Sequence, residues 1–118
     1  MDDLYRAPTS GADQLKAGLA LQMVAAATGV PVERMSGNAR RTGQACRARW
    51  LAMYLAHVTF GWPIERVAHA FGLNRATAAQ ACRWAEDERD RPGLDDLLNR
   101  MERSVHDLLD GPRYELRA

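Results

Sequence analysis

The chain has 118 residues, enough for one domain with its own hydrophobic core and too few for two ordinary domains. With 47% apolar and 26% charged residues it is close to an average globular protein, and it holds no apolar run of 18 residues that would span a membrane. Sixteen basic and fifteen acidic residues leave a formal net charge of +1, which by itself indicates neither nucleic acid nor an anionic membrane as partner.

The N-terminal third predicts an arm followed by two helices. Residues 1–11 have no periodicity and are expected to form a flexible arm. Apolar residues recur at helical spacing over residues 12–28, which predicts a helix that turns four of them into the core: Leu15, Leu19, Met23 and Ala26. Gly29 is expected to end this helix, and a short helix follows from Pro31 to Met35.

The middle of the chain predicts a loop and three helices. Residues 36–44 contain two glycines and two adjacent arginines and are expected to form an exposed basic loop. An apolar stripe predicts a helix over residues 45–60. The next two predicted helices, residues 63–71 and 75–89, form a linked pair around a turn at Gly72.

The last predicted helix, residues 94–110, is leucine-rich and has the clearest amphipathic pattern in the chain. A short tail, residues 111–118, follows it. No segment alternates apolar and polar residues as a strand would. The sequence therefore predicts an all-α fold: a compact helical domain of about six helices over residues 12–110, containing a helix-turn-helix.

Patterns typical of enzymes and metal sites are missing from the sequence. It has no GxxxxGK or GxGxxG loop for a nucleotide, and its three histidines are scattered. Cys46 and Cys82 lie far apart, with no CxxC or HxxxH pair near them, and are expected to be ordinary core or helix-surface residues in a reducing cytoplasm. We therefore expect no enzymatic activity, no metal and no cofactor.

The charges are distributed unevenly along the chain. Residues 34–83 hold eight arginines against one acid, a net charge of +7, whereas residues 84–110 have a net charge of −5. A basic segment that contains a basic loop and a linked helix pair is typical of a DNA-binding surface. In a helix-turn-helix the N-terminal residues of the second helix approach the base edges, and here these are Asn74, Arg75 and Thr77. The alternative from the residues alone is a solvated arginine face on a plain helical hairpin.

Residues 47–86 resemble the C-terminal DNA-binding domain, domain IV, of the bacterial replication initiator DnaA. The similarity rests on four landmarks of that family, in order along the chain: Arg47, AMYLA at 52–56, AFG at 70–72 and ACR at 81–83. Upstream residues are similar to the family's first helix and basic loop, so that the resemblance spans about residues 12–107. No phosphate-binding loop is present, and we expect a stand-alone domain without the initiator's ATPase.

The resemblance implies a helix-turn-helix in the major groove and a basic-loop arginine, Arg47, in the adjacent minor groove. The family usually has Asp-His-Thr-Thr at the start of the recognition helix, where this chain has Asn-Arg-Ala-Thr at 74–77, so we expect a different DNA site. The remaining basic residues of the surface are expected to contact phosphates: Arg40, Arg41, Arg49 and Arg83.

Three hypotheses follow for a cytoplasmic, nucleoid-associated bacterial protein. The first is a sequence-specific double-stranded DNA-binding transcription regulator, whose acidic C-terminal helix meets RNA polymerase or another regulator. The second is a replication-control protein that competes with the initiator at its boxes. The third is a protein–protein adaptor with a degenerate helix-turn-helix, which would use the leucine-rich last helix and two candidate exposed tryptophans, Trp62 and Trp84.

Overall fold

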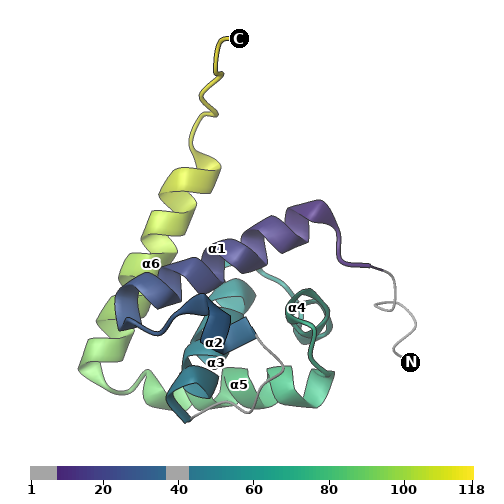
Figure 1. The fold of residues 1–118 in the computed structure, drawn as a ribbon. Helices are drawn as coiled ribbons and strands as arrows, with labels where there is room; N and C mark the ends of the chain where they lie inside the picture. Colours follow the sequence, from purple (N-terminus) through teal and green to yellow (C-terminus); the bar gives the residue numbers. More distant parts are fainter. Residues whose placement is uncertain (1–7, 37–42) are drawn as a thin grey trace.

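The computed structural model describes residues 8–36 and 43–118, and within these ranges the chain forms six α-helices and no strand (Figure 1). The predicted all-α class is therefore confirmed. The helices are α1 (Gly11–Thr28), α2 (Val32–Ser36), α3 (Gly43–Phe60), α4 (Ile64–Phe71), α5 (Arg75–Glu88) and α6 (Pro92–Asp110).

The helix ends lie close to the predicted ones because local capping residues set them. Ser10 accepts a hydrogen bond from the Asp13 amide at 3.1 Å and starts α1, and Gly29, at φ 79°, ends it in the left-handed conformation. Helix α3 begins at Gly43, two residues before the predicted start, and α6 begins at Pro92 rather than at residue 94. Most of the predicted basic loop, residues 37–42, lies outside the described residues.

Helix α3 is the centre of the fold and packs against each of the other five helices (Figure 1). Its middle section is buried from Leu51 to Ala56. This continuous burial exceeds the stripe that periodicity predicted, because neighbours surround the helix. The largest side chains with almost no exposed surface are Trp62, Tyr54, Met35, Met53, Leu55 and Leu98.

The predicted buried face of α1 is only partly confirmed: Leu19 and Met23 are partly buried, and Met23 packs against the core. Leu15 is 65% exposed and Ala26 is also exposed, whereas Asp13, Ala17, Ala20 and Val24 are buried. The buried face consists mainly of small residues because α1 packs closely on α3, and small side chains let two helix backbones approach. The long apolar side chain of Leu15 therefore did not identify the packed face.

Helix α6 is packed as far as Val105, and its C-terminal end extends away from the body (Figure 1). Leu98, Met101 and Val105 are buried, but Leu108 is 68% exposed, so the predicted apolar stripe continues beyond the packed part of the helix. No helix in the described ranges is long and apolar enough to cross a lipid bilayer.

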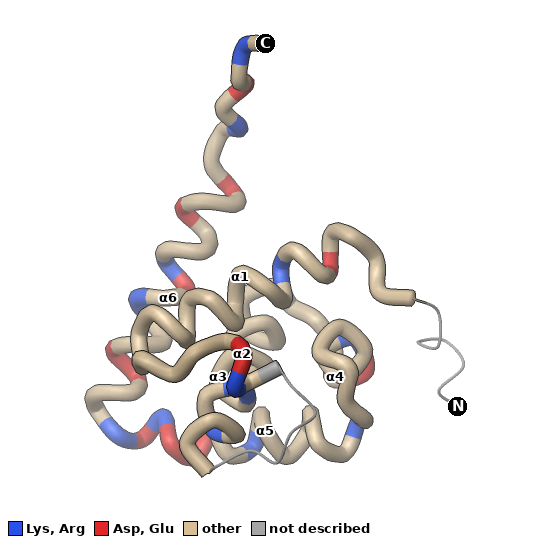
Figure 2. The backbone as a smooth tube through the Cα atoms, viewed as in Figure 1, with Lys and Arg blue, Asp and Glu red and all other residues tan. Residues whose placement is uncertain are grey.

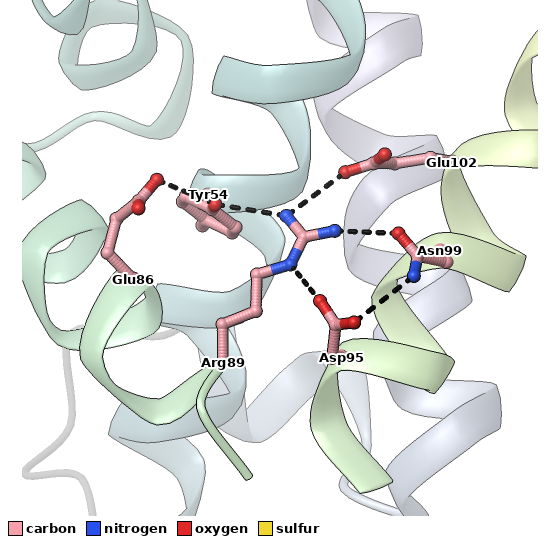
Figure 3. Close-up of polar contacts among 6 residues, drawn as sticks. All are labelled: Tyr54, Glu86, Arg89, Asp95, Asn99 and Glu102. Atoms are coloured by element: carbon pink, nitrogen blue, oxygen red, sulfur yellow. Dashed lines mark hydrogen bonds and ion pairs between the residues drawn. The ribbon is translucent and has the colours of Figure 1, made fainter. Parts of the chain in front are cut away.

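A polar cluster around Arg89 fastens α6 to α3 and α5 (Figure 3). The Arg89 guanidinium donates to Asp95 Oδ1 at 2.7 Å and to Asn99 Oδ1 at 2.8 Å, both on α6. It also donates to the Tyr54 hydroxyl of α3 at 3.1 Å, and that hydroxyl donates to Glu86 at 2.8 Å. One arginine just after α5 thus connects three helices.

Candidate nucleic-acid interface

Helices α4 and α5 form the predicted helix-turn-helix, joined by a tight turn. Gly72 has φ 70°, a left-handed conformation that favours glycine, and the Leu73 amide donates back to the Ala68 carbonyl at 2.9 Å. Asn74 then caps α5, with its Oδ1 accepting from the Thr77 amide at 2.8 Å. These local hydrogen bonds fix where the second helix of the pair begins.

The outer face of α5 is polar and open to solvent. Asn74, Arg75 and Arg83 are exposed as predicted for a recognition helix, whereas Thr77 is half-buried. Gln80 is also exposed, between Arg75 and Arg83 along the helix, and sequence reasoning did not select it. Its position three residues before Arg83 would have placed it on the same face, and glutamine is a side chain that reads adenine in the major groove.

Arg75, the first residue of α5, is paired with a carboxylate from α4. Its Nε donates to Glu65 Oε2 at 2.7 Å, and the two side chains remain 62% and 41% exposed. The hydrogen bond from Arg75 lowers the pKa of the Glu65 carboxyl below its usual value. The pair therefore lies on the surface at the turn, where the two helices of the motif meet.

Arg47 lies near the start of α3, is exposed, and contacts α5 through an aromatic ring. Its guanidinium carbon is 5.6 Å from the centre of the Trp84 ring, a distance at which a cation and an aromatic face attract each other. Trp84 in turn packs edge-on against Trp50, with ring centres 5.8 Å apart. The start of α3 and helix α5 are thus in contact through Arg47, Trp50 and Trp84.

Arg49 is placed differently from the other predicted phosphate-binding residues. It is 8% exposed, and its Nη2 donates to the carbonyl oxygen of Phe71 at 2.8 Å. A phosphate contact would require this buried bond to break, so the geometry favours a structural role in place of the predicted one. Arg47 and Arg49 are two residues apart on α3, so their side chains point to nearly opposite sides of the helix. This explains why Arg47 faces solvent and Arg49 faces the core.

The remaining predicted contacts are Arg40 and Arg41, which lie outside the described residues.

The distribution of charge can be followed in Figure 2. It shows the basic residues of α3, α4 and α5 and the acidic residues that follow from the end of α5 into α6. Arg66, a basic residue of α4, is turned to α1, where it makes two hydrogen bonds with Asp13 at 2.8 and 3.0 Å. The uneven charge of the sequence is thus also uneven in space.

The tryptophans offered as a partner surface have different environments. Trp62 is 2% exposed and belongs to the core, which contradicts its predicted exposure. Trp84 is half-buried against Trp50.

Burial raises the pKa of the Cys82 thiol to about 11. The described residues contain no group of three or more histidine, cysteine or acidic side chains suited to a metal ion.

Comparison with known proteins agrees with this geometry. Residues 19–84, more than half of the chain, match the family described as the bacterial dnaA protein helix-turn-helix. No curated protein and no solved structure matches the chain. The match covers α3, the turn at Gly72 and most of α5, the elements that build the exposed basic surface. The chain therefore belongs to the bacterial dnaA protein helix-turn-helix family, whose helix-turn-helix is a domain that binds double-stranded DNA.

Proposed function

We propose that this protein is a sequence-specific DNA-binding transcription regulator. Helix α5 enters the major groove with Arg75, Asn74 and Gln80 near the base edges, and Arg47 reaches the adjacent minor groove. Arg83 contacts a phosphate, as do Arg40 and Arg41. The acidic helix α6 extends away from this surface and is available to RNA polymerase or to a second regulator.

The observation that carries this proposal is the contact between Arg47 and Trp84. It joins the basic start of α3 to the recognition helix, at 5.6 Å from guanidinium to ring centre. Readout of both grooves by one small domain requires the two arginine-bearing elements to keep a fixed relative position. A packed tryptophan pair below Arg47 supplies such a fixed support.

Sequence specificity at the usual DnaA box is not part of the proposal. The recognition helix of this chain starts with Asn-Arg-Ala-Thr. The arginine at the second of these positions favours contact with guanine, and it replaces the histidine that the family usually has there. Competition with the initiator at its own boxes would need the same base-reading groups. We therefore favour a distinct recognition sequence, and regulation of transcription over control of replication.

The experiment that tests the proposal is selection of bound duplexes from a random pool, followed by chromatin immunoprecipitation with sequencing. We expect one enriched motif that differs from the DnaA box, with genomic peaks at a few promoters. Peaks confined to the replication origin, or enrichment of the DnaA box itself, would favour replication control. No enrichment, together with equal weak affinity for every duplex, would rule out sequence-specific binding and favour the adaptor.

A matched pair of variants separates base reading from phosphate contact. We expect Arg75→Ala to reduce discrimination at one base position, by about 1–3 kcal/mol, and to leave weak binding to other sequences. Arg83→Ala should weaken all duplexes alike and lower the slope of affinity against salt concentration by about one ion. Identical behaviour of the two variants would contradict the assigned roles.

A further inference from the structure

The ion pair between Glu65 and Arg75 engages one edge of the arginine. Glu65 Oε2 receives the Nε–H at 2.7 Å, and within residues 8–36 and 43–118 no other hydrogen bond of this guanidinium is made. The terminal nitrogens Nη1 and Nη2 therefore keep their N–H groups for another acceptor. A guanidinium carries five such donors in a rigid plane, so that one edge can be held while the other binds.

Two parallel acceptors are what the terminal edge of an arginine fits. Guanine presents O6 and N7 side by side in the major groove, and an arginine that meets both distinguishes guanine from the other bases. A free arginine side chain loses rotamer freedom when it is immobilised at an interface, and this loss opposes binding. Holding Nε beforehand reduces that loss, because the guanidinium plane is already restrained before DNA arrives.

A carboxylate on this surface needs a reason, because it would otherwise repel phosphates. Glu65 is the only acidic residue between residues 34 and 83, a segment that holds eight arginines. It lies in the first turn of α4, where the helix dipole favours a negative charge, so a purely structural role is the competing explanation. The two roles differ in what they predict for base discrimination, which the dipole does not affect.

We propose that Glu65 is a positioning residue for base recognition, which holds Arg75 by its Nε so that Nη1 and Nη2 meet a guanine. This inference rests on the proposed sequence-specific binding. It assigns a specificity-determining role to Glu65, a residue of the first helix of the motif. In this proposal Glu65 contacts no base itself. The partner is a guanine in the major groove, at the position read by the start of α5.

The test measures the DNA affinity of four proteins. These are the wild type, Glu65→Ala, Arg75→Ala and the double variant. The duplexes carry the selected site with either guanine or adenine at the base pair that Arg75 is proposed to contact. We expect Glu65→Ala to lower the guanine-to-adenine affinity ratio several-fold, while its affinity for unrelated duplexes stays the same or rises as a negative charge is lost. In the Arg75→Ala background the second substitution should leave the ratio unchanged.

Glu88→Ala is the matched control. Glu88 pairs with the Nε of Arg91 at 3.4 Å, so this variant removes the same charge and a longer ion pair at the far end of α5. It should leave the guanine-to-adenine ratio at the wild-type value. Urea unfolding of each variant checks that the domain stays folded, and Glu65→Gln, which keeps an acceptor without the charge, should lie between wild type and Glu65→Ala.

The outcomes separate this inference from the proposed function. If wild type prefers guanine, Arg75→Ala loses that preference and Glu65→Ala keeps it in full, the positioning role of Glu65 is wrong and sequence-specific binding stands. If Arg75→Ala keeps the preference for guanine, Arg75 does not read that base and the inference is wrong. If the wild type itself binds all duplexes alike, the proposed function and this inference both fail.

Discussion

The guanidinium of Arg49 donates from Nη2 to the carbonyl oxygen of Phe71 at 2.8 Å, and so ties the central helix α3 to the last residue of α4. The carbonyls at the C-terminal end of a helix lack partners within the helix and carry partial negative charge, which a buried cation stabilises. Because Phe71 directly precedes the turn at Gly72, this bond also helps to fix the geometry of the helix-turn-helix.

We predict that Arg49→Met lowers the free energy of unfolding by about 1.5–3 kcal/mol, the range for a hydrogen bond to a charged group. Methionine keeps much of the apolar stem, so the change isolates the polar contact. Urea unfolding followed by circular dichroism measures it. Arg83 is an exposed arginine of α5, so Arg83→Ala is the control. It should change the free energy of unfolding by less than about 0.5 kcal/mol.

The same pair of variants distinguishes structure from phosphate contact. Arg49→Met should retain the wild-type dependence of DNA affinity on salt when measured under conditions where it is folded. Arg83→Ala should show a weaker dependence, because one phosphate contact is lost. An equal reduction of the salt dependence in both variants would restore the phosphate role that the sequence suggested for Arg49.

A second prediction concerns the support of Arg47 by Trp84. Replacement of Trp84 by leucine removes the aromatic face 5.6 Å from the guanidinium, and we expect DNA affinity to fall about two- to five-fold, equivalent to about 0.5–1 kcal/mol for a cation–π contact. Fluorescence anisotropy with a labelled duplex measures the change. Trp84→Phe, which keeps a ring, should retain most of the affinity.

The double variant Arg47→Ala, Trp84→Leu gives the decisive comparison. If Trp84 acts through Arg47, the loss from Trp84→Leu should disappear once Arg47 is alanine. A loss of the same size in both backgrounds would mean that Trp84 supports DNA binding by another route. Because Trp50 packs edge-on against Trp84, the unfolding free energy of each variant is measured alongside.

The sequence was sufficient to predict those parts of the fold that depend on local chemistry. Gly29 and Gly72 end helices in the left-handed conformation, and Asn74 starts one by capping an amide, so these boundaries needed no tertiary information. The pairing of α4 and α5 into a helix-turn-helix followed from the same signals. Arg75 and Arg83 of α5 are exposed, as the sequence predicted from the known outer face of the second helix of such a motif, and their contact with DNA stays a prediction.

Features that depend on long-range packing were missed. The buried residues of α1 are Asp13, Ala17, Ala20 and Val24, and the hydrophobicity of Leu15 pointed to the wrong side of the helix. Arg49 and Arg47 are alike in sequence, and only their different orientations on α3 separate a core contact from a surface one. The pairing of Glu65 with Arg75 required the turn geometry, since ten residues separate them in the chain.

A third prediction concerns acid stability. Asp13, at the start of α1, is 8% exposed and accepts two hydrogen bonds from Arg66 of α4, which lower the pKa of its carboxyl below the usual value. A carboxyl whose pKa is lower in the folded state stabilises the fold above its unfolded pKa of about 3.9. That stability is lost as the pH falls through the lower, folded pKa.

Asp13→Asn should therefore lower the unfolding free energy at pH 7 by about 1 kcal/mol, a value reduced because the Arg66 side chain is 42% exposed and screened by solvent. The difference from wild type should shrink as the pH is lowered below about 4, where Asp13 takes up a proton in the unfolded chain, and it should disappear once the pH falls below the lower, folded pKa. Asp87→Asn, an exposed carboxyl on α5, is the control. A difference that stays constant between pH 7 and pH 3 would show that the charge of Asp13 is not what stabilises the fold.

The last prediction concerns the Tyr54 hydroxyl in the cluster around Arg89 (Figure 3). It donates to Glu86 at 2.8 Å and accepts from Arg89 at 3.1 Å, and removing it by Tyr54→Phe should cost about 1 kcal/mol at pH 7. Burial, reinforced by the bond to Glu86, raises the pKa of Tyr54 above its usual value. The folded protein therefore favours the neutral phenol.

The sign of the alkaline effect follows from that shift. A raised pKa in the folded state contributes stability that is present below the unfolded pKa of about 10 and is lost as the pH rises through the folded value. The stability gap between wild type and Tyr54→Phe should thus narrow above about pH 10, as measured by urea unfolding at pH 7 and pH 10.5. The Cys82 thiol, with a pKa of about 11, affects both proteins equally and cancels in the difference. Tyr114→Phe, in the exposed tail, should leave stability unchanged at both pH values. A gap at Tyr54 that does not narrow would mean that folding does not raise the pKa of its hydroxyl.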